Sequence, residues 1–316
     1  MIDIIITDTH FGWKNNSLTW LNYQMKFIYD ELIPHIKKLN NVRVIHLGDV
    51  FDSRSTISTY VATKVVQAFK DIRSVCDEFI VVCGNHDFYS PNSDTVNTVK
   101  LFMNNMDIII VDQDIYESDN HVYIPWYKWI DGIENGFNIG DGDIYTHADI
   151  FRDTIPLELS NRRIFSGHIH TPNIFKNRYN LGSTYVLNFA DANQDRGYYV
   201  VDNDNVTFVP NKTSIKFYRL YNDEILNADL TKFNKDDYIE LYVTENNLSK
   251  DNYITAIKSF TDEFSKVWTI PQSVTNTNTD TTEFTGYDIE SIIDDMIPED
   301  LNPFYLRIKS KINKID

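Results

Sequence analysis

The sequence contains little cysteine and no long apolar run. Only two of its 316 residues are cysteines, Cys76 and Cys83, which excludes a disulfide scaffold and a zinc ribbon and is typical of reduced proteins of the cytosol. The segment from Met1 to Ile6 carries neither a basic leader nor an apolar stretch of signal-peptide length, and no later segment approaches the length of a membrane span. We therefore expect a soluble, cytoplasmic protein with no membrane partner.

Positive charge is also scarce. The chain has 29 lysines and arginines against 46 acidic residues, which gives a formal net charge of -17. Affinity for DNA comes largely from basic side chains that displace counterions from phosphates, so this balance taken alone argues against a DNA-binding protein. Carboxylates that surround metal ions are offset by the charge of the ions, and a partner protein could supply further positive surface. The charge balance is therefore compatible with a metal-dependent enzyme that acts on nucleic acid.

Apolar residues are plentiful enough for folded domains: 42% of the chain is hydrophobic and 14% aromatic. Residues 1–211 alternate short β-branched runs with helical stretches, which predicts an α/β layered domain. The predicted strands are Asp3–Thr7, Val42–Leu47, Phe79–Cys83, Ile108–Val111, Val122–Ile124, Asp143–Thr146, Arg163–Ser166 and Tyr198–Asp202. The predicted helices are Leu18–Leu39, with Pro34 kinking or ending it, Thr56–Ser74, and Asp94–Asn104 with Asp94 as N-cap.

The remaining third of the chain has a different pattern. Residues 212–272 predict a small α+β domain, with strands at Ser214–Tyr221, Tyr238–Thr244 and Val267–Ile270 and a helix at Ser249–Phe264. Residues 273–286 are polar and low in complexity, which indicates a flexible tether. Residues 287–316 carry an apolar stripe among charged residues. This last segment is either a partner-binding helical element or a helix that folds back on its own domain.

Five polar clusters directly follow apolar strands. They are Asp8-Thr9-His10, Gly48-Asp49-Val50-Phe51-Asp52, Gly84-Asn85-His86-Asp87, His147 and Gly167-His168-Ile169-His170. Because the carboxyl ends of strands are where loops converge in open α/β sheets, all five clusters can meet in one site. Residues two apart on an extended segment point to the same side, which pairs Asp8 with His10 and His168 with His170.

The chemistry of these clusters indicates a metal centre. Imidazole, carboxylate and amide donors together suit manganese, iron or zinc better than calcium or copper. A single Asp-x-His after a strand is common without a metal, and His147 alone would be read as a core or surface histidine. Five of the eight histidines fall in the clusters, however, and only His35, His46 and His121 lie outside them, so we treat those three as structural.

The order Asp-x-His, Gly-Asp-x-x-Asp, Gly-Asn-His-Asp, His, Gly-His-x-His resembles the calcineurin-like metallophosphoesterases, and the match runs from Asp8 to His170. The resemblance implies a four-layer sandwich of two mixed sheets flanked by helices, with a small α+β capping domain and a C-terminal helical tail. It also implies two divalent ions, Mn²⁺ or else Mg²⁺, Fe²⁺ or Zn²⁺. One ion would be held by Asp8, His10, Asp49 and His170, and the other by Asp49, Asn85, His147 and His168.

Further segments resemble the SbcD-type nuclease subunits of DNA-processing complexes, those of phages included. They are Ile124-Pro125-Trp126, Ser166 to Thr171, Leu181-Gly182-Ser183 and Arg196-Gly197-Tyr198-Tyr199. The resemblance implies cleavage of DNA in recombination and repair, a homodimer through residues 56–74 and 94–104, and an SbcC-like coiled-coil ATPase bound by residues 287–316. From the sequence alone the two helical faces are equally well explained as core. A phage-encoded chain would act in the host cytoplasm.

Several residues near the metal centre have candidate roles. A shared hydroxide would attack the phosphate, and His86 is our candidate for protonating the leaving sugar oxygen, because its neighbour Asn85 is the ligand. Asp87 or Asp52 would orient the His86 imidazole, and we favour Asp87. Arg54 either contacts a substrate phosphate or pairs with a carboxylate on the rim. A basic track toward DNA, or merely solvated charge, is formed by Lys176, Arg178, Arg196, Lys212 and Lys216.

Two other function classes compete with a nuclease. A phosphatase or small-molecule phosphodiesterase would use the same scaffold, but the phosphatases end their motifs in Gly-Asp-x-x-Asp-Arg-Gly and Gly-Asn-His-Glu, whereas this chain has Asp52-Ser53-Arg54 and Asp87. A non-catalytic adaptor on the same fold is the second rival. Every predicted metal-ligand position carries a residue that can bind a metal. This argues against an adaptor that has lost its catalytic site.

Overall fold

The computed structural model describes residues 1–90, 93–153 and 155–272. The described residues form one compact unit. The segments predicted as tether and partner-binding tail, 273–286 and 287–316, lie outside the described residues. No helix in the described part of the chain is both long and apolar enough to cross a lipid bilayer.

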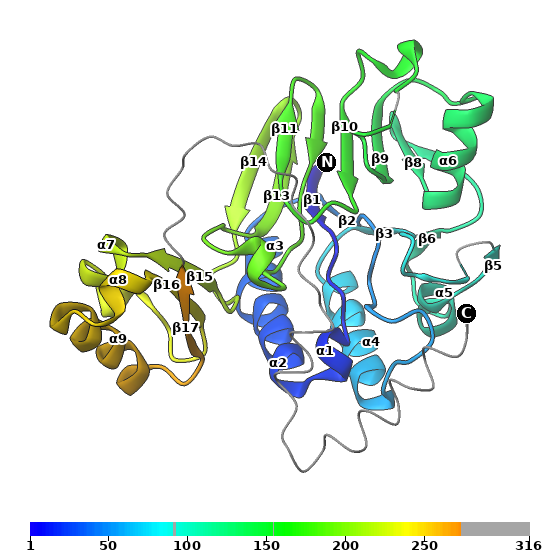
Figure 1. Cartoon of the computed structure of the whole chain (residues 1–316). Helices are drawn as coiled ribbons and strands as arrows, with labels where there is room; N and C mark the ends of the chain where they lie inside the picture. The colour runs from blue at the N-terminus through cyan, green and yellow to red at the C-terminus, as the bar shows by residue number, and fades with distance from the viewer. Residues whose placement is uncertain (91–92, 154, 273–316) are drawn as a thin grey trace, which may run out of the picture. The chain divides into compact units, whose positions relative to one another are not determined.

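Two six-stranded sheets form the centre of the unit (Figure 1). The first has the order β14 (Asn205–Pro210), β13 (Gly197–Asp202), β1 (Ile2–Ile6), β2 (Val42–His46), β3 (Glu78–Val82) and β6 (Ile109–Val111). The second has the order β11 (Asn173–Phe175), β12 (Arg178–Asn180), β10 (Ile164–Gly167), β9 (Asp143–His147), β8 (His121–Ile124) and β7 (Tyr116–Ser118). In the first sheet β1, β2, β3 and β6 are parallel, and β13 and β14 are antiparallel at one edge. In the second sheet β8, β9, β10 and β12 are parallel, and antiparallel strands close both edges.

The apolar strands are buried on both faces, as parallel strands in layered folds usually are. In β1, Ile4 and Ile6 face the helices whereas Ile5 faces the second sheet. The first helical layer consists of α2 (Leu18–Lys26), the π-helical turn η1 (Phe27–Leu32), α3 (Ile33–Ile36), α4 (Thr59–Arg73) and α5 (Thr98–Met103). On the far side, α6 (Trp126–Asn135) covers the second sheet through Trp129. The predicted four-layer α/β sandwich is therefore confirmed.

The predicted helix Leu18–Leu39 forms in three consecutive pieces. Pro34 lies in the first turn of α3, which follows η1 directly. Proline has no N–H to donate to the preceding turn, and a local widening of the helix accommodates that loss. The helix continues only to Ile36, so Pro34 distorts the segment shortly before its end.

The predicted helix Asp94–Asn104 needs correction. Residues Ser93–Asn97 form strand β5, which pairs with β4 (Phe88–Ser90), and α5 begins only at Thr98. The N-cap is Asn97, whose side chain accepts a hydrogen bond from the Lys100 N–H, and not Asp94. Pairing with β4 is a contact between segments of the chain, which helix-capping preferences do not report.

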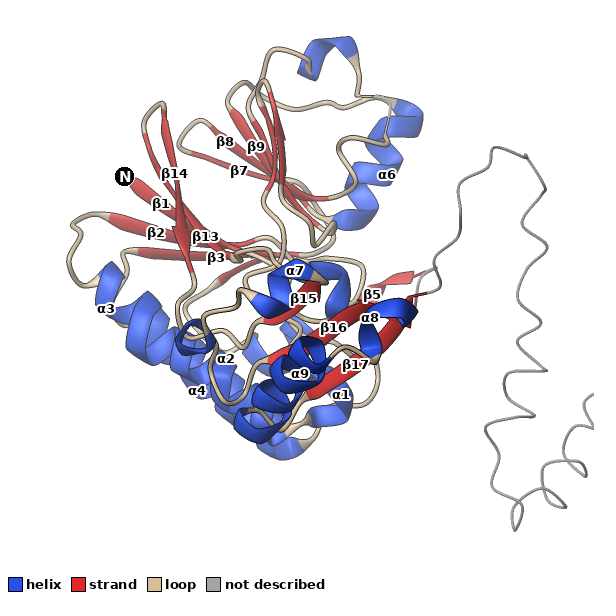
Figure 2. Cartoon of the chain, turned by 60° about the vertical axis from the view of Figure 1, so that its left-hand side comes forward, coloured by secondary structure: helices blue, strands red, loops and turns tan. Residues whose placement is uncertain are grey.

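Residues 212–272 build a smaller sheet with its own core. Its strands β15 (Phe217–Tyr221), β16 (Tyr238–Thr244) and β17 (Val267–Gln272) are all parallel. The helices α7 (Asp223–Leu226), α8 (Glu245–Leu248) and α9 (Asp251–Glu263) lie on one face, where Ile239, Leu241 and Val243 are buried (Figure 2). The other face contacts α2 through Trp20, which packs with Phe217.

The remaining elements are short. They are α1 (Trp13–Asn16), with left-handed residues inside it, and the 3-10 turns η2 (Leu157–Leu159), η3 (Phe189–Asp191) and η4 (Leu230–Lys232).

Candidate metal centre

Loops at the carboxyl ends of parallel strands carry the predicted ligands. Asp8 and His10 follow β1, Asp49 follows β2, Asn85 follows β3, His147 ends β9, and His168 and His170 follow β10. The strands of each sheet run in the same direction here, so their ends open at a common edge. The structure brings all seven predicted ligands together at this edge.

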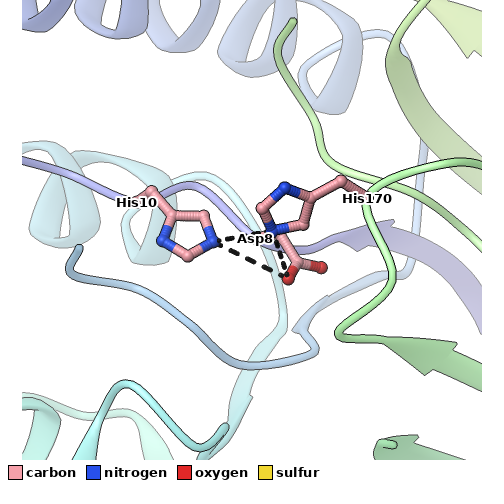
Figure 3. Close-up of side chains that lie close together, drawn as sticks. All are labelled: Asp8, His10 and His170. Atoms are coloured by element: carbon pink, nitrogen blue, oxygen red, sulfur yellow. Dashed lines mark hydrogen bonds and ion pairs between the residues drawn. The ribbon is translucent and has the colours of Figure 1, made fainter. Parts of the chain in front are cut away.

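One donor group consists of Asp8, His10 and His170, whose side chains point toward one another (Figure 3). The His10 and His170 Nε2 atoms are 3.1 Å apart, and the Asp8 Oδ1 atom lies 3.9 Å from the first and 3.7 Å from the second. Donor atoms that share one ion at 2.0–2.2 Å are separated by about 3 to 3.5 Å. These three atoms could therefore hold one metal ion with little movement.

A second donor group consists of Asp49, Asn85, His147 and His168. The Asn85 Oδ1 atom lies 3.1 Å from His147 Nε2 and 3.0 Å from His168 Nδ1. The Asp49 Oδ1 atom is 3.3 Å from His147 Nε2. Asp49, His147 and His168 satisfy the spacing expected for a shared ion, and the amide oxygen of Asn85 adds a neutral donor to the same group.

Asp49 lies between the two groups. Its Oδ1 atom faces His147, and its Oδ2 atom is 3.8 Å from His10 Nε2. Burial disfavours the charged form of this carboxyl, but the imidazoles of His147 and His10 outweigh that effect and hold its pKa below the ordinary value. An ionised carboxylate with one oxygen toward each donor group is the geometry that bridges two cations.

The same charges act on the histidines of the second group. Burial opposes protonation of His147, yet the Asp49 carboxylate raises the pKa of His147 to about 9. Burial and the neighbouring His147 lower the pKa of His168 to about 4. Because a metal ion binds the neutral imidazole, a proton on His147 competes with the ion at this position.

The backbone at the site is strained, as it commonly is where function requires a fixed geometry. Asp8, His10, Asp49 and His168 all have positive φ angles, of 50°, 42°, 53° and 79°. Gly48 has a φ of +85°, and a Cβ atom there would lie 2.6 Å from the Gly84 nitrogen and 2.7 Å from His147 Nδ1. Only glycine allows this close approach of the β2 loop to the β3 loop and to His147.

Neighbouring groups orient the donors. The His147 Nδ1 atom lies 2.6 Å from the Leu47 carbonyl oxygen, which can only accept, so Nδ1 carries the proton and Nε2 faces Asp49 and Asn85. The Asp8 carboxylate accepts hydrogen bonds from Thr7 Oγ1 at 2.7 Å and from the His168 N–H at 3.2 Å. Sequence reasoning missed these supports, because the way that loops pack decides which carbonyl or hydroxyl reaches a donor side chain.

His86 lies beside the donors but is held differently. Its Nδ1 atom is 2.7 Å from the Asp52 carbonyl oxygen, and its backbone N–H donates to Asp49 Oδ1 at 2.8 Å. The carbonyl fixes the proton on Nδ1, so Nε2 is the atom that exchanges a proton. The imidazole is half-buried and its ring centre is 5.2 Å from that of His10. Its side-chain donors also lie near those of His10 and Asp52, within the spacing of a cation site.

The contacts of Asp87 and Asp52 differ from the expected ones. The Asp87 carboxylate is buried and accepts from the backbone N–H groups of Asp49, Val50 and Gly84 at 2.8–2.9 Å. Both oxygens are thus used to join the two loops, and the orientation of His86 comes from the Asp52 carbonyl. The Asp52 carboxylate lies 3.6 Å from His10 Nδ1. The preference for Asp87 over Asp52 as the orienting residue is therefore corrected.

Other predicted residues occupy varied places. Arg54 is half-buried and lines a cavity of about 240 Å³ with Ile57 and Phe102. Arg196 does not belong to a surface track, since it is buried and bonded to Asp191 at 2.6 Å. Lys176 and Lys212 are exposed, Lys216 pairs with Asp195, and Arg178 bonds the Ile150 carbonyl.

The three histidines outside the clusters stay outside the site. His46 is fully buried and bonds Thr9 Oγ1, His35 bonds the Tyr198 hydroxyl, and His121 contacts Arg43.

Two tryptophans flank the donor groups. The Trp126 ring centre lies 4.7 Å from that of His168, and Trp13 lies 5.9 Å from His10. Both side chains restrict the imidazoles they contact. Trp126 belongs to the Ile124-Pro125-Trp126 segment noted in the sequence, whereas Trp13 carried no signal there.

Comparison with known families identifies the superfamily of the chain. The profile of the calcineurin-like phosphoesterase superfamily domain matches residues 1–202. The chain is similar to the Pseudomonas putida nuclease MPE, with 16% identity, a TM-score of 0.32, and coverage of 57% of this chain and 67% of that one. It is also similar to phosphopantetheinyl hydrolase (PptH) of Mycobacterium tuberculosis, with 12% identity, a TM-score of 0.31, and coverage of 57% and 89%. No curated protein matches the sequence.

Proposed function

Because the chain belongs to the calcineurin-like phosphoesterase superfamily, we propose that it is a metal-dependent DNA nuclease of the SbcD type. The observation that supports a two-ion phosphodiesterase most directly is the position of Asp49, which presents one oxygen to each of two complete donor groups. The preference for DNA rests on the segments that resemble SbcD-type subunits, above all those of the T-even phage recombination endonuclease.

The residues of the site fit a hydrolytic cleavage of a phosphodiester. Two bound ions, Mn²⁺ by preference, would polarise the phosphate and lower the proton affinity of a shared water. His10 and His147 keep Nε2 directed at the donor groups, since Asp52 lies beside the other nitrogen of His10 and the Leu47 carbonyl accepts from that of His147. His86 carries its fixed proton on Nδ1 and delivers a second one from Nε2 to the leaving sugar oxygen.

A direct assay separates a nuclease from a small-molecule phosphodiesterase. The full chain is incubated with Mn²⁺ and either duplex DNA or bis(p-nitrophenyl) phosphate, with EDTA as the blank. We expect cleavage of both, with DNA preferred in kcat/KM. Hydrolysis of the small diester without any cut in DNA would overturn the nuclease proposal and leave the phosphodiesterase. Hydrolysis of neither by a metal-loaded sample would favour the adaptor.

We further propose that the nuclease works in a complex. Residues 287–316 would bind an SbcC-like coiled-coil ATPase, and this proposal rests on their sequence. A second copy would bind near α4 and α5, where the side chains of Tyr60 and Leu101 are 54% and 73% exposed although most apolar residues of α4 are core. Affinity purification from the native host, followed by nuclease assays with and without ATP, tests the ATPase partner. Sedimentation of Leu101→Glu beside wild type tests the dimer.

A further inference from the structure

One face of the small sheet carries aromatic side chains that are not covered by its helices. The strand register places Phe217 beside Tyr238, Tyr221 beside Tyr242, and Trp268 beside Glu240. We call this set, with Arg219, the aromatic face. The opposite face is buried under the helices. On the aromatic face, Phe217 and Tyr238 pack in part against Trp20 and Phe189, whereas Trp268 and Tyr221 remain exposed.

The rings of the aromatic face form a stacked series that ends in solvent. The ring planes of Phe217 and Tyr238 are 9° apart at 4.5 Å, and those of Tyr238 and Trp268 are 13° apart at 6.0 Å. Phe217 is buried against Trp20 of α2, Tyr238 is half-buried, and Trp268 is 46% exposed. A second stacked pair joins Tyr242 to Tyr221, which is 43% exposed. Exposed rings that extend a stack are the surfaces on which planar bases pack.

Cations gather on the same rings, although the chain as a whole is strongly acidic. The Nζ atoms of Lys14 and Lys266 lie 5.0 Å and 4.6 Å from the centre of the Tyr238 ring. The Arg219 guanidinium lies 6.0 Å from the Tyr242 ring. Lys266 and Arg219 have acidic neighbours, Asp236 and Glu240. Lys14 has no carboxylate within ion-pair distance among the described residues, so its charge is available to a phosphate.

Lys14 links the aromatic face to the segment that carries His10. Lys14 is four residues after His10, and Trp13 between them contacts the His10 ring. Lys14 in turn reaches across to Trp20, Phe217 and Tyr238. A strand held on the aromatic face would therefore contact Lys14, in the segment that follows His10. This continuity connects the face to the substrate of the site.

We propose that the aromatic face binds unpaired nucleotides of the substrate, with bases stacked on Trp268 and Tyr221 and phosphates held by Lys14, Lys266 and Arg219. The inference rests on the proposed nuclease function and specifies its substrate as DNA with a single-stranded segment. Bases in an intact duplex are stacked on one another and cannot lie flat on a protein ring. Unpaired bases can, and every base has a face that stacks.

Binding of a single strand in EDTA tests the aromatic face without cleavage. The full chain is titrated into fluorescein-labelled oligothymidylate of about 12 nucleotides, and fluorescence anisotropy gives the Kd. We expect Trp268→Ala and Tyr221→Ala each to weaken binding at least about fivefold, and Trp268→Phe to retain most of the affinity, since stacking needs a ring. The control is Phe208→Ala, because Phe208 is an exposed ring on the edge strand β14 of the first sheet. It should leave the Kd unchanged.

Two results would overturn the inference: equal affinity of wild type and both alanine variants, or equal affinity of wild type for a blunt duplex of the same length. Thermal unfolding of each variant shows whether it is folded. If Trp268→Ala does not fold, Trp268→Phe and Tyr221→Ala still test the inference. Hydrolysis of bis(p-nitrophenyl) phosphate by wild type with Mn²⁺ reports the metal centre separately. If wild type hydrolyses this diester but the alanine variants bind the single strand as tightly as wild type, only the role of the aromatic face is rejected, and the proposed metal centre is not.

Discussion

Individual side chains at the centre divide into donors and supports. The donors present free nitrogen or oxygen atoms to one another, as His10 and His170 do at 3.1 Å. The supports, such as Thr7 and the Leu47 carbonyl, use up the remaining hydrogen-bonding positions of the donors. Since mutation of a donor and of a support changes different observables, the roles proposed above can be separated one residue at a time.

His86→Ala should abolish hydrolysis while the metal content stays normal. The imidazole is assigned to proton transfer through Nε2, and loss of general acid catalysis typically costs 10²–10⁴-fold in rate. Metal analysis of the purified variant and kcat on DNA are measured together. If the variant loses its metal together with its activity, His86 is a ligand and belongs with His10 and Asp52.

His147→Ala should lower metal occupancy, because the second donor group would lose one of its four members. The variant also leaves a cavity, since His147 is fully buried. His46→Ala is the matched control: His46 is equally buried, ends strand β2 of the first sheet, and bonds Thr9 Oγ1. Metal titration followed by calorimetry should show weaker binding only for His147→Ala. An unchanged metal-to-protein ratio would remove His147 from the ligand set.

Asp87→Asn should destabilise the fold by about 1–3 kcal/mol, because an NH₂ group would then face a backbone N–H where a carboxylate oxygen now accepts. Urea unfolding in EDTA measures the change without a contribution from bound metal. Asp107→Asn is the control, since Asp107 is exposed and forms only a surface pair with Arg73. Equal stability of both variants would show that Asp87 does not join the loops.

Elements position the donors by ending together. Strands β1, β2, β3, β9 and β10 were predicted from the sequence to within a residue or two, since their runs of β-branched and aromatic residues are buried on both faces. The short strands β7, β11, β12 and β14 were not predicted, because three of them have only three residues and none is a continuous apolar run. The N-cap of α5 is Asn97 and not the predicted Asp94, because residues Ser93–Asn97 pair with β4. A local sequence pattern does not reveal this pairing.

Gly48→Ala tests whether the turn after β2 fixes the site. Its φ of +85° disfavours alanine, and the added Cβ would overlap the Gly84 backbone and His147. Gly136→Ala is a matched control, since Gly136 has a φ of +90° with nothing within 4 Å of a Cβ. We expect Gly136→Ala to lower the free energy of unfolding by about 1–3 kcal/mol, because its backbone, at φ 90° and ψ 152°, lies in a region that L residues rarely adopt. Gly48→Ala should lose more unfolding free energy than Gly136→Ala, and only Gly48→Ala should bind metal more weakly than wild type. Equal losses with intact metal binding would contradict the turn's role.

At the scale of the whole molecule, the four layers put polar ligands from two sheets at one edge, and the small sheet adds a second surface beside it. The sequence could predict which donor side chains lie together, because motif order and spacing depend on strand ends. It could not predict which residue orients His86, or that Arg196 is buried against Asp191. Both depend on how loops pack in three dimensions. The aromatic face also depends on strand register, which sequence patterns of short strands leave open.

The central claim is that one pocket holds two divalent ions around Asp49, and anomalous diffraction from crystals grown with Mn²⁺ tests it most directly. We expect two peaks, about 3.5 to 4 Å apart, with Asp49 between them. One peak should lie against Asp8, His10 and His170, and the other against Asn85, His147 and His168. A crystal in which no ion lies within bonding distance of the Asp49 carboxylate would contradict the account.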